Sequence, residues 1–238
     1  MISTRERFRS LIPPAAVRLV DRLHRALDGT MCKSYSQEGE DLLLSRLLGE
    51  RGPGFYVDIG AHHPRRFSNT QLFYERGWRG LNIEPAPDAI ELFRVARTRD
   101  VNLALGVSDT PGELTYYVFD DTALNTFDEN LKRQRENGTP YRVVASCRIP
   151  VERLDRILAQ FLPARQSIDF LSVDAEGLDL AVLRSNDWQV YRPEIVLVEA
   201  LDFALERAGS HPLHTFMTGV GYELVAKTLN TLFYRDRG

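Results

Sequence analysis

Two short apolar segments of the chain end in residues that suit a bound nucleoside. Val57 leads through Asp58 to a turn at Gly60, and Leu81 leads to Glu84. Both segments are typical of buried parallel strands. A glycine at the carboxyl end of such a strand lets the backbone turn sharply and lets a ligand approach closely. An acid at the end of the next strand can accept hydrogen bonds from two ribose hydroxyls, so the pair predicts a nucleoside-containing cofactor.

These residues need a sheet that presents several strand ends at one edge. Apolar segments predict strands over 55–59, 80–84, 101–105, 113–119, 142–150, 168–173 and 195–198. Helical patterns lie between them, at 37–49, 69–76, 87–96, 151–160 and 178–184. Alternating strands and helices predict an α/β fold with a doubly wound, mostly parallel sheet. The segments 222–226 and 231–234 predict an antiparallel strand pair that closes this sheet at its C-terminal end.

Four carboxylates stand at the ends of predicted strands, and they are Asp58, Glu84, Asp174 and Glu199. The carboxyl ends of parallel strands meet at one edge of a sheet, and ligands of open α/β sheets bind beyond that edge. We therefore expect the four acids to line one rim of a ligand site.

Composition limits the classes of protein that fit. The chain has 238 residues, 43% of them apolar, and a formal net charge of −3. This length suits one α/β domain with a sizeable core, which we assign to residues 31–238. The charge argues against nucleic acid as a partner. Cys32 and Cys147 have no metal-binding spacing and indicate reduced thiols in a cytoplasmic protein. No apolar run is long enough to span a bilayer.

Two further segments differ from the rest of the chain. Residues 1–30 hold several arginines, and their apolar residues recur at helical spacing, which predicts an amphipathic helical extension. We expect this helix to dock on the domain, and its alternatives are peripheral contact with a membrane or a homodimer contact.

Residues 120–140 are rich in charge and poor in apolar side chains. They predict a loop or short exposed helix, and we interpret them as a candidate lid.

Four separated blocks of the sequence resemble the FkbM-type S-adenosylmethionine-dependent methyltransferases. The blocks are 36–41 (SQEGED), 55–61 (FYVDIGA), 82–85 (NIEP) and 172–177 (SVDAEG). The resemblance extends from about residue 35 to about residue 199. It implies a class I (Rossmann-like) methyltransferase fold and S-adenosyl-L-methionine as the cofactor. It also implies O-methylation of a small-molecule or glycan acceptor, such as a sugar, a glycolipid, a polysaccharide or a related natural product.

The turn after the first strand separately argues against a pyrophosphate. Dinucleotide sites of the NAD type use the pattern G-x-G-x-x-G to seat a pyrophosphate on a helix start. Here Gly60 is followed by Ala61, His62, His63 and Pro64. A nucleoside without phosphates, such as S-adenosylmethionine, fits this turn better. An NAD-dependent oxidoreductase or epimerase is one alternative, and a non-catalytic scaffold on the same fold is another.

The residues expected to bind the cofactor lie at strand ends and in the turns beside them. Glu84 suits a diol, because a carboxylate can accept two hydrogen bonds from neutral donors. The resemblance places the turn of Asp58 and Gly60 against the methionine part and the ribose. The complete set is Gln37, Asp58, Gly60, Ala61, Asn69, Thr70, Glu84, Pro85, Ser108, Asp109 and Asp174.

Some members of this set have a second interpretation. Gln37 either contacts the amino-acid end of the cofactor or belongs to a helix cap. Asn69 and Thr70 either face the cofactor or cap the following helix. Ser108 and Asp109 follow the third strand, where the resemblance places the adenine, but a turn leading into Pro111 explains them nearly as well.

The catalytic candidates are Asp174, Glu176, His62 and His63. A sugar hydroxyl is too weak an acid to ionise alone at neutral pH, so it needs a base within hydrogen-bond reach or a metal ion. Asp174 or Glu176 suits the role of base, and a histidine titrates near neutrality. Alternatively, Asp174 and Glu199 ligate Mg²⁺ or Ca²⁺, which prefer oxygen ligands. In a third interpretation Asp174 only binds the ammonium group of the cofactor.

Overall fold

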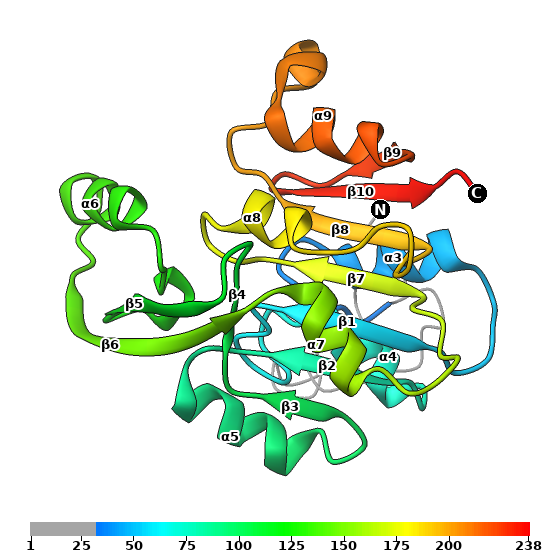
Figure 1. The fold of residues 1–238 in the computed structure, drawn as a ribbon, viewed down its shortest axis with the longest axis horizontal. Helices are drawn as coiled ribbons and strands as arrows, with labels where there is room; N and C mark the ends of the chain where they lie inside the picture. Colours follow the sequence, from blue (N-terminus) through cyan, green and yellow to red (C-terminus); the bar gives the residue numbers. More distant parts are fainter. Residues whose placement is uncertain (1–31) are drawn as a thin grey trace, which may run out of the picture. The chain divides into compact units, whose positions relative to one another are not determined.

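A computed structural model describes residues 32–238 of the chain, so the expected helical extension of residues 1–30 lies outside the described residues. Ser34–Gly238 form one compact unit (Figure 1). Within the described residues, no helix is both long enough and apolar enough to cross a lipid bilayer.

The unit alternates strands and helices over most of its length. Its strands are β1 (Phe55–Ile59), β2 (Arg79–Ile83), β3 (Val101–Leu103), β4 (Gly106–Val107), β5 (Gly112–Phe119), β6 (Val143–Glu152), β7 (Phe170–Val173), β8 (Ile195–Glu199), β9 (Tyr222–Lys227) and β10 (Thr231–Asp236). Its helices are α3 (Glu40–Leu48), α4 (Gln71–Glu75), α5 (Pro87–Ala96), η1 (Thr122–Leu124), α6 (Glu129–Gly138), α7 (Leu154–Phe161), α8 (Asp179–Arg184), η2 (Leu205–Ser210) and α9 (Pro212–Gly219).

The main sheet has seven strands in the order β3-β2-β1-β7-β8-β10-β9. The first five strands of this order run parallel to one another. Strand β10 runs antiparallel to both β8 and β9. This arrangement confirms the predicted doubly wound sheet with an antiparallel C-terminal pair. The order reverses between β1 and β7, and ligands of such sheets bind at this switch point.

Strand β1 shows why both faces of the sheet are covered. Its side chains alternate between two apolar clusters, as the period of a strand requires. Val57 and Ile59 pack in the cluster that includes Leu158 of α7. Tyr56, between them in sequence, packs in the cluster that includes Leu44 of α3. A near-continuous apolar strand therefore serves two helical layers, which is typical of parallel sheets.

The segments predicted as strands over 113–119 and 142–150 lie outside the main sheet. They form a separate three-stranded sheet in the order β4-β6-β5. The strand expected over 101–105 is correspondingly split, because β3 ends at Leu103 and β4 at Gly106–Val107 pairs with β6 instead. Figure 1 shows β5, β6 and α6 beyond the end of the main sheet at which the parallel strands finish.

Candidate functional site

A cavity of about 400 Å³ lies at the carboxyl ends of the parallel strands. This volume is within the usual range for small-molecule sites, about 300–1,000 Å³. All four acids that end the predicted strands line it. The sequence-predicted residues that line it are Gln37, Asp58, Gly60, Ala61, His62, Asn69, Glu84, Pro85, Asp174, Glu176 and Glu199. Four others, His63, Thr70, Ser108 and Asp109, are not among its lining residues.

Glu84 follows β2 and is held by the backbone on both sides. Its Oε2 accepts a hydrogen bond from the His62 amide at 2.7 Å, and its Oε1 accepts one from the Ala86 amide at 2.8 Å. Glu84 is 4% exposed. Burial raises its pKa to about 7, although the two hydrogen bonds act to lower it. Each carboxylate oxygen has two lone pairs, so a fixed Glu84 retains acceptor capacity for a ligand.

Asp58 is the last residue but one of β1, and Thr70 supports its carboxylate. The Thr70 hydroxyl donates to Asp58 Oδ2 at 3.1 Å, and Thr70 in turn accepts from the buried guanidinium of Arg97. Burial raises the pKa of Asp58 to about 6. Thr70 therefore positions Asp58 instead of lining the cavity. Its neighbour Asn69 does line the cavity and donates to Ser172 Oγ of β7 at 3.1 Å.

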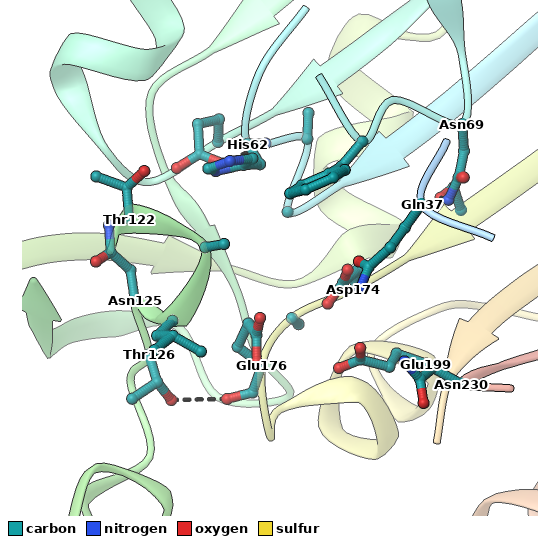
Figure 2. A pocket seen from close by; sticks show the side chains of 18 of the residues that line it. Gln37, His62, Asn69, Thr122, Asn125, Thr126, Asp174, Glu176, Glu199 and Asn230 are labelled. Carbon is teal, nitrogen blue, oxygen red and sulfur yellow. Dashed lines mark hydrogen bonds between the residues drawn. The ribbon is translucent and has the colours of Figure 1, made fainter. Parts of the chain in front are cut away.

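A carboxylate cluster lies at the ends of β7 and β8. One side-chain oxygen from each of Asp174, Glu176 and Glu199 lies within 4.8 Å of the others, and Figure 2 shows their carboxylates together on one wall. Burial and the neighbouring acids raise the pKa of Asp174 well above its usual value, and they raise that of Glu199 to about 8. Like charges this close are not all ionised without compensation, so the cluster holds a proton or attracts a cation.

The members of this cluster are not equivalent. Glu176 forms an ion pair with Arg135, so its carboxylate already has a cationic partner. Asp174 Oδ1 is buried and has no hydrogen-bond partner among the described residues. In Figure 2 the side chain of Gln37 points toward Asp174. Within residues 32–238, Asp174 thus has a buried oxygen without a hydrogen-bond partner, whereas Glu176 is committed to the ion pair.

The two adjacent histidines have different surroundings. His62 lines the cavity with a positive φ of 54°, and burial lowers its pKa. The Nδ1 atom of His63 accepts hydrogen bonds from the amides of Arg65 and Arg66 at 3.0 and 2.9 Å. His63 therefore holds the turn after the first strand, and only His62 faces the cavity.

Ser108 and Asp109 follow β4 of the smaller sheet and do not lie at the end of β3. The Ser108 amide donates to the carbonyl of Glu152 at 3.1 Å, which continues the pairing of β4 with β6. The residues at the end of β3 are instead apolar. Leu105 and Phe127 line a small recess with Pro85 beside the cavity. The sequence-based expectation placed the polar pair here because it extended β3 to residue 105.

The candidate lid of residues 120–140 contains η1 and α6, and it borders the cavity. Its lining residues are Asp121, Thr122, Ala123, Leu124, Asn125, Thr126, Phe127 and Arg135. The hydroxyl of Thr126 donates to the carbonyl of Glu176 at 2.7 Å (Figure 2). Arg135 is 9% exposed, and it also donates to the carbonyl of Leu124 at 2.7 Å. The sequence does not mark Thr126 or Arg135 as residues of the site, because Glu176, which both contact, lies far away in the chain.

The strand order and the acid-lined crevice at the switch point define a class I methyltransferase fold. The chain belongs to the FkbM methyltransferase family: the model of the methyltransferase FkbM domain matches residues 58–224. This match confirms the resemblance to the family, although the block at 36–41 lies outside the matched residues. No curated protein matches the chain.

Two solved structures of methyltransferases are similar to this chain. A methyltransferase FkbM from Methylobacillus flagellatus is 15% identical, with a TM-score of 0.51 over 84% of this chain and 48% of that chain. The protein thus spans about half the length of that relative. The C-terminal domain of precorrin-6Y C5,15-methyltransferase from Rhodobacter capsulatus is also 15% identical, with a TM-score of 0.41 over 88% of this chain and 91% of that domain.

Proposed function

We propose that this protein is a cytoplasmic, S-adenosylmethionine-dependent O-methyltransferase that acts on a hydroxyl of a sugar, glycolipid, polysaccharide or related natural product. The observation that carries the proposal is the position of Glu84. It is buried at the end of β2 and lines the cavity beside the turn of Gly60. A fixed carboxylate at this place in a member of a methyltransferase family suits the ribose diol of the cofactor.

The rest of the cavity suits the same cofactor. Asp58 and Ala61 stand beside Glu84, where the ribose and the methionine part would lie. The apolar recess of Leu105 and Phe127 would receive the adenine after widening. The sulfonium and ammonium groups of S-adenosylmethionine are cationic, and the acid-rich wall complements them. No second glycine follows Gly60 to seat a pyrophosphate, which weighs against NAD.

We assign the role of general base to Asp174. When bound, the cofactor supplies an electrophilic methyl group and a neutral thioether as leaving group. The chain must align the acceptor oxygen with that methyl, and alignment can lower a barrier by about 7–11 kcal/mol. Asp174 Oδ1 is buried without a hydrogen-bond partner in the described part of the chain, and we assign it as the acceptor of the hydroxyl proton. Burial and the neighbouring acids raise the pKa of this carboxyl, so it holds a proton more strongly than an exposed aspartate does. Glu199 lies close to Asp174, and the two carboxyl groups share one proton in this arrangement.

A divalent ion is the alternative occupant of the carboxylate cluster. Asp174 and Glu199 would supply the ligands, because their oxygens lie within 4.8 Å of each other and Mg²⁺ and Ca²⁺ prefer oxygen donors. Bound there, such an ion would acidify the acceptor hydroxyl. Loss of turnover in the presence of a chelator would distinguish a bound ion from a proton shared by Asp174 and Glu199.

Calorimetry with S-adenosylmethionine and NAD tests the cofactor assignment. We expect the wild-type protein to bind S-adenosylmethionine and not NAD. Glu84→Gln should weaken binding by about 1.5–3 kcal/mol, because its bonds to the ribose lose their charge. Glu91→Gln, on the exposed face of α5, is the matched control and should bind as the wild type does. Binding of NAD alone would favour the oxidoreductase or epimerase, and unchanged binding by Glu84→Gln would favour the scaffold.

A further inference from the structure

Phe67 is an exposed aromatic residue in the wall of the cavity. Its side chain is 42% exposed, and it lines the cavity between the turn after β1 and α4. Its backbone has a positive φ of 56°, a conformation that a bulky residue rarely adopts. Such strain is typically kept where a site requires it. The backbone thus holds an apolar ring in the cavity wall, where it is exposed to water.

Arg66 lies beside this ring. Its guanidinium carbon is 4.5 Å from the centroid of the Phe67 ring, so the cation covers part of the ring. Arg66 and Arg135 are the two cations among the lining residues of the cavity. Arg135 is paired with Glu176, whereas Arg66 has no salt bridge to any residue that the structure describes. Arg66 is therefore the cation that can receive an anion from outside.

The turn that carries both residues is built firmly. His63 accepts the amide of Arg66 at 2.9 Å. The fully buried Arg97 donates two hydrogen bonds to the carbonyl of Pro64, at 3.1 and 2.7 Å. The amide of Ser68 donates to the carbonyl of Tyr35 at 3.1 Å. Residues 63–68 are thus fixed on both sides, and the pair of Arg66 and Phe67 is arranged before any ligand binds.

We propose that Arg66 and Phe67 form the acceptor subsite, and that the acceptor is a sugar that carries an anionic group, a phosphoryl or carboxylate. The sugar ring packs against Phe67, and the anion binds the guanidinium of Arg66, which suits phosphate and carboxylate geometry. This inference rests on the proposed methyltransferase function and names its substrate class.

Charge also sets the direction of the acceptor. The inner wall carries Asp174, Glu176 and Glu199, which repel an anion and accept hydrogen bonds from hydroxyls. The anionic end is therefore held at Arg66, and a neutral hydroxyl points toward Asp174. The same arrangement orients the hydroxyl for methyl transfer.

The test uses the full chain saturated with S-adenosylhomocysteine and titrated calorimetrically with inorganic pyrophosphate and with uridine diphosphate glucose. Arg66→Gln should weaken both probes at least about tenfold. Arg65→Gln is the matched control, because Arg65 pairs with Glu75 at 3.8 Å outside the cavity lining. It should change affinity by less than about threefold, since exposed ion pairs contribute little. Phe67→Leu should weaken only the sugar-bearing probe, by about 3–10-fold.

Several results would overturn the subsite. The anion site is ruled out if the wild-type protein does not bind pyrophosphate, or if Arg66→Gln binds pyrophosphate as tightly as the wild type does. Weakened binding of S-adenosylhomocysteine in Arg66→Gln would instead assign Arg66 to the carboxylate of the cofactor. If the wild-type protein does not bind S-adenosylhomocysteine at all, the proposed function fails, and the subsite falls with it.

A second experiment distinguishes the source of the anion. The wild-type protein is incubated with a cell extract and S-adenosylmethionine labelled in its methyl group. The labelled product should be retained by an anion exchanger, and a neutral labelled product overturns the proposal. Extraction of the label into organic solvent identifies a lipid-linked sugar phosphate, whereas label that stays in water identifies a soluble nucleotide sugar or acidic glycan.

Discussion

The carbonyl oxygen of Asp174 lies directly against the backbone of Gly60. A Cβ built on Gly60 would stand 1.7 Å from that oxygen, and Gly60 has a φ of 74°. The Gly60 amide donates to the carbonyl of Ile83, and the Asp174 amide donates to the carbonyl of Ile59, both at 3.0 Å. The ends of β1, β2 and β7 therefore meet at one junction, which fixes the proposed cofactor turn relative to the proposed base.

Gly60→Ala should disrupt this junction. The added methyl meets backbone, which cannot move aside, and the positive φ adds strain. We expect the free energy of unfolding to fall by more than about 2 kcal/mol and cofactor binding to be lost. Urea unfolding and calorimetry measure the two effects. Gly209→Ala meets no atom within 4 Å and serves as the control. Wild-type binding by Gly60→Ala would contradict the close packing.

The buried Glu84 should make the stability of the cofactor-free protein depend on pH. Its pKa is raised from 4.5 to about 7, chiefly by burial. The folded protein therefore binds more protons than the unfolded chain between these values, and its stability falls as pH rises through 7. From pH 6 to pH 8 the contribution of Glu84 should fall by about 1.4 kcal/mol. Urea unfolding at pH 6 and pH 8 measures the free energy of unfolding, which should change less with pH in Glu84→Gln than in the wild type. An equal change in both proteins would contradict the raised pKa of Glu84.

Arg135→Met should release the lid. The change removes the ion pair with Glu176 and leaves a half-buried carboxylate without its cation. We expect turnover to fall, cofactor affinity to change little, and proteolysis within residues 120–140 to increase. Arg133→Met is the control, because Arg133 pairs with Glu129 on the exposed side of the same helix. In the wild type, bound acceptor should protect this segment, and equal cleavage with and without ligand would count against a gating role.

Turnover should survive a metal chelator. In the arrangement that we favour, Asp174 and Glu199 share a proton, and Asp174→Asn should reduce the rate by about 10²–10⁴-fold by removing the base. Methyl-transfer assays with and without EDTA measure both effects. Activity that EDTA abolishes and Mg²⁺ or Ca²⁺ restores would reassign the cluster to a divalent ion. Asp109→Asn, exposed and outside the cavity lining, provides the control.

Residues at the strand ends could be predicted because their placement is local. Apolar segments specify buried strands, and a strand that stops at an acid or a glycine puts that residue at the sheet edge. Asp58, Gly60 and Glu84 were located in this way, and all three line the cavity. The same reasoning misplaced Ser108, because the sequence does not show that the chain leaves the main sheet after Leu103.

The sequence by itself determined the family, the alternation of strands and helices, and the acids at the switch point. Only the tertiary structure decided which of these acids have ion-pair or hydrogen-bond partners. It brought Arg135 to Glu176, 41 positions further along the chain, and left Asp174 with a free oxygen. It also made His63 a support of the turn and exposed Phe67 beside Arg66. The periodicity of a sequence sets which side of an element is buried, but contacts between distant segments depend on how the elements pack.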